Sequence, residues 1–221
     1  NAIHTTTATA DLLPIMLRDS AHIQEADAAY LNQKTNRRDQ PPVIPLYTLA
    51  DAEAAIRLIQ AHAYGESVIL PGGVRLVHVD AGHILGAALA RLEIPQPEGA
   101  SLRVALVFDL GRYNLPLLND PVQITDVDIL ISESTYGDRL HEDARNEGED
   151  LRMAVNRALA RGGKVMIPTF ALGRAQEIVY LLAQLRERKE IPEVPVYLDS
   201  PMAQAISRVF EKSKTYLDEE Y

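Results

Sequence analysis

The sequence predicts a mixed α/β protein, with a strand-rich first part and a second part in which strands and helices alternate. Short runs of aliphatic and β-branched residues follow one another between residues 67 and 134, a pattern typical of neighbouring strands. After Tyr136, strand-like runs alternate with amphipathic helical runs, an order that favours a parallel α/β unit. We therefore expect two domains, residues 1–136 and residues 137–221.

The first elements are expected to be mainly helical. Residues 8–34 join an apolar run to a stretch rich in Ala, Gln and Glu, which indicates a long helix. The three prolines of residues 40–48 favour an extended connector. Thr48 and Asp51 then form a capping-box pattern at the head of residues 51–62, whose apolar positions recur at helical spacing.

The remaining elements follow from the succession of apolar and polar runs. The strands expected in the first part are residues 67–70, 74–80, 88–94, 102–109 and 127–134. The second part is expected to run helix, strand, helix, strand, helix over residues 151–163, 164–170, 173–189, 194–200 and 201–213. The two strands of the second part would lie parallel, because a helix separates them.

Composition limits the classes of protein and the kinds of site. The chain has 221 residues, of which 47% are apolar and 24% charged, and it contains no cysteine. The absence of cysteine excludes disulfides, cysteine nucleophiles and thiolate zinc sites, so any transition metal would be held by His, Asp or Glu. The formal net charge of −9 argues against a broad basic surface but leaves room for a local basic cleft. No apolar run is long enough for a membrane span, and a cytoplasmic location is expected.

Three polar residues stand where strands of the predicted sheet end. His83 follows the second strand in the segment DAGHILGAA, while Asp109 and Glu133 come at the ends of the fourth and fifth strands. If these strands are neighbours in one sheet, their ends share an edge, and one imidazole and two carboxylates converge in a cleft. That set suits a zinc or manganese site with a proton-transfer carboxylate beside it. The plainer alternatives are a solvated histidine, a turn-forming aspartate and a helix-capping glutamate.

Two further positions are expected to support such a site. Asp80 is placed to orient His83 without binding the metal itself, as metal-bound imidazoles commonly require, and Gly82 would allow a tight approach. The segment PTFALGRAQE leads from a strand into a helix, whose first N–H groups favour a phosphate. Gly173 and Arg174 are therefore candidate RNA phosphate contacts. The alternative is that they only begin the helix, with Arg174 on its solvated face.

Several segments resemble the β-CASP branch of the metallo-β-lactamase superfamily, which includes bacterial RNase J, archaeal homologues and the endonuclease subunit of the eukaryotic cleavage and polyadenylation machinery. DAGHILGAA resembles a motif that supplies a metal-binding His, and VFDLGRYNLPLLNDP one whose Asp bridges two metals. SESTYGDRLH resembles a motif whose acidic residue helps to protonate the leaving group. GGKVMIPTFALGRAQEIVYLL and VYLDSPMA are typical of the β-CASP domain, and the resemblance extends over almost the whole chain.

The resemblance implies a fold and a set of roles. Residues 1–136 would form the later part of a metallo-β-lactamase αββα sandwich, and residues 137–221 the start of a β-CASP α/β domain with parallel strands. His83 and Asp109 would bind metal and Glu133 would take part in proton transfer. The implied cofactors are two zinc ions, with manganese as the alternative metal.

Two features depart from the family pattern. The HxHxDH motif that provides most of the metal ligands is absent from these 221 residues, as are the later His motifs. We expect the first before Asn1 and the others after Tyr221, so that the chain is an internal segment and inactive by itself. Val107 and Phe108 stand where the family usually has Ser-Gly, which indicates either a different local turn or residues absent from the sequence as given.

The function implied by the resemblance is a zinc-dependent RNA-processing nuclease that hydrolyses phosphodiester bonds with a metal-activated water. RNA is the expected partner, no membrane contact is expected, and a homodimer is one option for the oligomeric state. Two rival interpretations stay open: a catalytically inactive β-CASP-type subunit, and a metallo-hydrolase of the same fold acting on a small ester or thioester. Endonucleolytic and exonucleolytic cleavage, and RNA or DNA as substrate, are all compatible with these residues.

Overall fold

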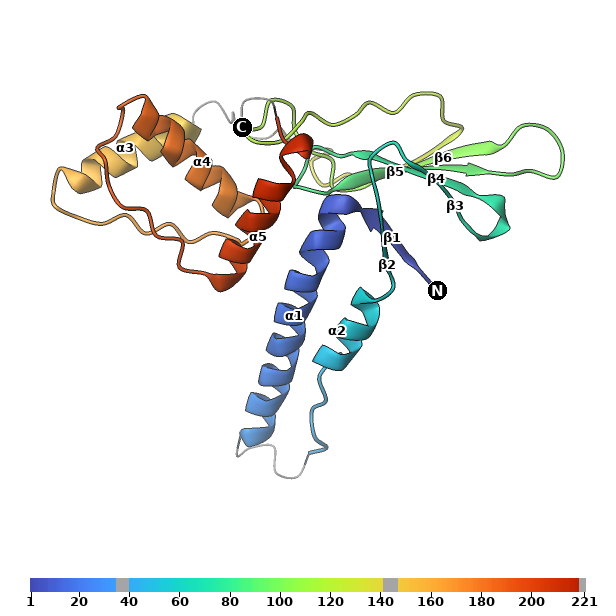
Figure 1. The fold of residues 1–221 in the computed structure, drawn as a ribbon, viewed down its shortest axis with the longest axis horizontal. Coiled ribbons are helices and arrows are strands. Elements are labelled where there is room, and N and C mark those ends of the chain that lie inside the picture. The colour runs from blue at the N-terminus through green and yellow to red at the C-terminus, as the bar shows by residue number, and fades with distance from the viewer. Residues whose placement is uncertain (35–39, 141–146, 219–221) are drawn as a thin grey trace.

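The computed structural model describes residues 1–34, 40–140 and 147–218. In Figure 1 a five-stranded sheet lies at one end of the molecule, three helices lie at the other, and two helices project from between them. The strands are β1 (Ile3–Thr6), β2 (Ile59–His62), β3 (Ser67–Ile69), β4 (Arg75–Asp80), β5 (Ala88–Ile94), β6 (Leu102–Val107) and β7 (Ile129–Ser132). The helices are α1 (Thr7–Gln33), α2 (Leu49–Ile56), α3 (Glu147–Leu159), α4 (Arg174–Glu187) and α5 (Pro201–Lys212), with 3-10 turns at Pro71–Gly73 and Lys214–Tyr216. The mixed α/β class predicted from the sequence is confirmed.

The large sheet has the strand order β3-β4-β5-β6-β7. Strands β3 to β6 pair antiparallel, and β7 pairs parallel to β6. Because β4 and β6 both run against β5, and β7 runs with β6, the strands β4, β6 and β7 all end at the same edge. The shared edge expected from the sequence is therefore present, although β5 separates β4 from β6.

The N-terminal region contains a small parallel sheet that was not predicted from the sequence. β1 pairs with β2 from Ile3↔Ile59 to Thr6↔His62. The capping box of Thr48 and Asp51 is present, but α2 ends at Ile56, and the last four residues of the predicted helix form β2 instead. The partner strand lies far away in the sequence, so local apolar spacing could not reveal this pairing.

The helices of the second part are confirmed, and its strands are not. The structure has α3, α4 and α5 where helices were predicted, but residues 164–170 and 194–200 are assigned to no strand. Met166, Phe170 and Tyr197 are 89%, 84% and 84% exposed. A strand requires a neighbour whose backbone completes its hydrogen bonds, and in the described residues neither segment has one. The predicted parallel strands of this part are therefore wrong for the described residues.

One core joins the two parts of the molecule. Helices α1 and α5 lie close together (Figure 1). Their facing sides are buried in one cluster, which also contains Leu85 from the loop after β4. The fully or nearly buried members are Ala8, Leu12, Leu85, Ile206, Val209, Phe210 and Leu217. Each large apolar side chain buried in this way contributes about 1.5–3 kcal/mol. The division into domains at residue 136 stays a prediction.

In the described part of the chain, none of the helices combines the length and the apolar character that crossing a bilayer requires.

Candidate functional site

A cleft of about 820 Å³ opens at the sheet edge where β4, β6 and β7 end. One wall comes from the loops after these strands, and the other from the start of α4 and from Phe210 of α5. The chemically active side chains in the lining are His83, Asp109, Arg112, Glu133, Tyr136, Arg139, Arg174 and Glu177. The structure thus brings the imidazole and the two carboxylates predicted from the sequence into one cleft.

The loop that carries His83 has a buried backbone and an exposed histidine. His83 is exposed, whereas Gly82, Leu85 and Gly86 are buried. Gly82 has a φ of +62°, and a Cβ atom there would lie 2.7 Å from the Pro121 nitrogen. Only glycine accommodates both this left-handed conformation and this close contact. The tight turn therefore presents His83 to the cleft while its neighbours anchor the loop.

Asp80 fixes the same turn from the end of β4. Its Oδ1 accepts a hydrogen bond from Gly82 N at 2.9 Å, and its carbonyl oxygen accepts one from Val122 N at 3.0 Å. Burial raises the pKa of Asp80, and hydrogen bonds from Gly82 and Asn119 oppose that rise. Asp80 thus contacts both Asn119 and the backbone of the turn, and its contact with the His83 loop is through Gly82.

The loop after β6 interlocks with the His83 loop. Gly111 N donates to Ala81 O at 2.8 Å, and a Cβ atom on Gly111 would lie 1.8 Å from Gly82 O. No side chain fits between the two loops, so glycine is required at this position. Asp109 precedes this contact with a φ of +49°, a strained conformation for a residue with a side chain. Phe108, which stands where the family usually has Gly, is 48% exposed.

Glu133 is held at the end of β7 by backbone amides. Its own N–H donates to Val107 O at 3.0 Å, which continues the pairing of β7 with β6. Its Oε2 accepts from Thr135 N at 2.9 Å and its Oε1 accepts from Leu110 N at 3.4 Å. The hydroxyl and amide of Thr135 hold the pKa of Glu133 below its usual range, with smaller contributions from Leu110 and His83. At neutral pH Glu133 is therefore a carboxylate that can accept a proton.

The opposite wall is the start of α4. Gly173 N already donates to Gln176 Oε1 at 2.9 Å, and Arg174 pairs with Glu177 at 3.0 Å. The Arg174 side chain is 47% exposed. A Cβ atom on Gly173 would lie 3.3 Å from Ile84 Cγ2, so this wall abuts the His83 loop. The two predicted phosphate contacts thus line the cleft, with Gly173 N engaged by Gln176.

Arg112, Tyr136 and Arg139 also line the cleft, although they were not predicted as site residues. The Arg139 guanidinium lies over the Tyr136 ring at 4.8 Å. Arg112 belongs to the motif of Asp109, and Tyr136 and Arg139 to that of Glu133, so the motifs themselves carried the signal. With Arg174, the lining has as many arginines as carboxylates. The cleft is balanced in charge within an acidic chain, rather than basic.

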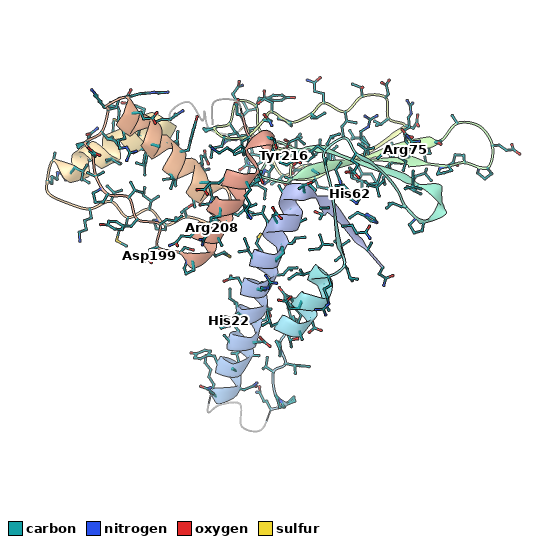
Figure 2. All side chains as sticks on the ribbon, in the orientation of Figure 1. His22, His62, Arg75, Asp199, Arg208 and Tyr216 are labelled. Carbon is teal, nitrogen blue, oxygen red and sulfur yellow. The ribbon has the colours of Figure 1, made fainter. Side chains whose placement is uncertain are left out.

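The donor types in the cleft fit a metal ion as part of its ligand set. Imidazole and carboxylate are ligands that zinc accepts. Among the described residues, however, no group of three or more His, Asp or Glu side chains is placed to hold a metal ion together. Figure 2 shows His22 far along α1, away from the sheet, so it adds nothing to the cleft. His62 is engaged by His4 at 3.1 Å and by Glu66 at 3.1 Å.

Comparison with known proteins identifies the relatives of this chain. A family model described as the Beta-Casp domain matches residues 175–221. Ribonuclease TTHA0252 of Thermus thermophilus is 33% identical over 99% of this chain and 44% of its own length. Cleavage and polyadenylation specificity factor 73 of Drosophila melanogaster is 33% identical over 78% of this chain and 24% of its own length.

The chain spans less than half the length of these curated relatives. A solved structure of MEM-A1, a subclass B3 metallo-β-lactamase from a soil metagenome library, covers 86% of this chain at 17% identity. Its TM-score of 0.30 is too low to bear on the fold. The family model lies beyond His83, Asp109 and Glu133, and the roles of these residues stay predictions. Residues 175–221 thus belong to the Beta-Casp domain, and the chain as a whole is similar to proteins named ribonuclease and cleavage and polyadenylation specificity factor.

Proposed function

We propose that the protein is a metal-dependent nuclease that hydrolyses RNA phosphodiester bonds in the cleft at the sheet edge. The observation that carries this proposal is the meeting of His83, Asp109 and Glu133 in one cleft. Support comes from relatives that are named ribonuclease and endoribonuclease.

His83 and Asp109 would be metal ligands, one imidazole and one carboxylate from two interlocked loops. A pair of zinc ions is the proposed cofactor, with manganese as the alternative. When bound, the ions supply an activated water and neutralise charge on the phosphate. The hydrogen bond from Gly111 N to Ala81 O joins the two loops. It would hold the backbones that carry His83 and Asp109 in place before any metal binds.

Glu133 would act first as the general base and then as the general acid of the reaction. As the water oxygen bonds to phosphorus, its proton passes to the Glu133 carboxylate, and the bond from phosphorus to the leaving oxygen breaks. Glu133 then returns the proton to that oxygen, so the carboxylate is restored at the end of the reaction. The hydrogen bonds from Thr135 and Leu110 keep the side chain in place and ionised beforehand.

The helical wall would hold the RNA backbone. Arg174 is half exposed and lines the same cleft as His83, and a guanidinium makes charge-assisted hydrogen bonds to phosphate. To contact a phosphate, Arg174 would exchange its ion pair with Glu177 for one with the ligand. Arg112 is placed to assist on the sheet side of the cleft.

Cleavage of single-stranded RNA by the full-length protein tests the proposal. The protein is incubated with end-labelled RNA as purified, after chelation, and after zinc is restored. We expect cleavage that chelation abolishes and zinc restores. Cleavage that persists after complete metal removal would overturn the metal-dependent reaction. Bound zinc without cleavage would favour the inactive-subunit alternative.

A further inference from the structure

Thr6 and Thr9, at the start of α1, form hydrogen bonds to the loop that carries His83. The hydroxyl oxygens of Thr6 and Thr9 each lie 2.8 Å from the carbonyl oxygen of Gly86. The two hydroxyls are 2.9 Å apart, and Thr6 Oγ1 also accepts a hydrogen bond from Thr9 N at 3.2 Å. A carbonyl oxygen has two lone pairs, so it can accept from both hydroxyls at once.

The hydrogen bond from Thr6 to Gly86 is buried, that from Thr9 is partly buried, and the helix and the loop are in close contact at both. Thr6 is 3% exposed and Gly86 is buried. Gly86 has a φ of +87°, and a Cβ atom there would lie 2.5 Å from Thr9 Oγ1 and 2.8 Å from Thr9 N. The helix therefore approaches the loop as closely as a glycine allows. A shift of either partner would leave a buried carbonyl without a donor, which is costly.

Helix formation alone does not account for the Thr9 hydroxyl. Thr6 already caps α1 through its bond to Thr9 N, as an N-cap threonine does. A threonine inside a helix usually returns its hydroxyl to a carbonyl of its own preceding turn. Thr9 instead donates to Gly86, far away in the sequence. The Thr9 hydroxyl therefore stabilises the position of the His83 loop rather than the helix.

The hydrogen bonds from Thr6 and Thr9 hold the Gly86 end of the His83 loop, and a separate contact holds its Ala81 end. At the far end, Ala81 O accepts from Gly111 N at 2.8 Å. Between the two ends, Leu85 is buried in the core of α1 and α5. His83 is thus the exposed residue of a segment tied at both ends and anchored beside it.

We propose that Thr9, together with Thr6, is a positioning residue that sets the orientation of the His83 ring in the cleft. The proposal rests on the proposed function in so far as that orientation serves metal binding. Thr9 touches neither metal nor RNA, and it acts through Gly86 and the loop backbone.

The test compares full-length variants at Thr9 with a matched control. Thr9→Val removes the hydroxyl and keeps the shape, whereas Thr9→Ser keeps the hydroxyl. Thr7→Val is the control, because Thr7 is the exposed neighbour in the same turn. The ring signal of His83 is followed by NMR on metal-free, histidine-labelled protein and assigned by its loss in His83→Ala. The zinc dissociation constant is measured by chelator competition on the same samples.

We expect Thr9→Val to shift or broaden the His83 signal and to weaken zinc binding about tenfold or more, the range typical of outer contacts to metal ligands. Thr9→Ser and Thr7→Val should match the wild type in both measurements. An unchanged His83 signal in Thr9→Val overturns the proposal, and so does a shift in Thr9→Ser as large as in Thr9→Val. If the wild type binds no zinc and cleaves no RNA, the proposed function fails, while the ring signal still decides the positioning role.

Discussion

The two walls of the cleft are built in different ways. On the sheet wall, His83, Asp109 and Glu133 stand on loops whose backbone groups bond to one another, as Gly111 does to Ala81. On the helical wall, Arg174 and Glu177 are long side chains that pair with each other at the start of α4. His83 and Asp109 are short side chains on fixed loops, and Glu133 is already held by two backbone amides, so these groups lose little freedom when they act. The long Arg174 side chain must be ordered by the ligand. We infer that the sheet wall carries the chemistry and the helical wall adapts to the substrate.

The largest expected effect comes from the sheet wall. His83→Ala removes the imidazole from the cleft and with it the proposed metal ligand. Metal ions supply several kcal/mol of transition-state stabilisation, so the rate of RNA cleavage should fall by roughly a thousandfold or more. Single-turnover cleavage by the full-length variant measures this. Wild-type cleavage in this variant would contradict the role of the sheet wall.

Glu133→Gln should have the next largest effect. Glutamine keeps the shape and one acceptor oxygen, so it can accept from Thr135 N but not also from Leu110 N, which bonds to the other carboxylate oxygen. It cannot take up a proton. We expect kcat to fall about a hundredfold or more, as for a lost general base, with little change in Tm.

The pH profile sharpens this result. In the wild type the pKa of Glu133 is lowered, first by the Thr135 hydroxyl, so the carboxylate persists and activity should hold until the pH falls below the ordinary range for Glu. Thr135→Val should move that acid limb upward. An unmoved acid limb would show that Glu133 does not control it.

Arg174→Ala tests the helical wall, with a smaller expected effect of a different kind. If Arg174 binds a backbone phosphate only, RNA affinity should fall by about three- to tenfold for all sequences, and its dependence on salt should become shallower. KM should rise while kcat stays near the wild-type value. Arg188, at the far end of α4, gives the matched control Arg188→Ala. A fall in kcat at constant KM would mean that Arg174 acts in the chemical step, and it would contradict the proposed difference between the two walls of the cleft.

The smallest expected effect is on stability, at Asp80. Burial raises the pKa of Asp80 in the folded state, so the folded protein holds its proton more tightly than the unfolded chain does. Stability therefore falls as the pH rises from the ordinary Asp range through the raised pKa. Asp80→Asn escapes this loss and can still accept from Gly82 N. Its Tm should exceed that of the wild type at pH 7, and the difference should vanish at acidic pH; thermal unfolding across pH measures both.

The sequence predicted the parts of the fold that depend on local pattern. The capping box of Thr48 and Asp51 and the strand of residues 88–94 appear where they were expected. The shared edge of β4, β6 and β7 also followed, because a run of neighbouring strands has few arrangements. The small sheet of β1 and β2 did not follow, since its pairing joins distant segments.

The unpaired segments show a second kind of limit. Residues 164–170 and 194–200 have the composition of strands, but composition fixes only the preference of the backbone. Whether such a segment pairs in a β-sheet depends on a neighbouring strand, which cannot be identified from the segment's own residues. The hydrogen bonds from Thr6 and Thr9 to Gly86 could not be predicted from the sequence either, because the local pattern around the two threonines does not indicate a contact with a distant loop.

The measurement that tests the central claim most directly is zinc content together with cleavage, on the full-length wild type and on His83→Ala. Elemental mass spectrometry gives the zinc bound per chain, and the same samples are assayed on single-stranded RNA. We predict that the wild type carries zinc, about two ions per chain, and cleaves RNA, and that His83→Ala loses zinc and cleavage together. A His83→Ala protein that keeps both would contradict the assignment of the sheet edge as the metal-dependent site.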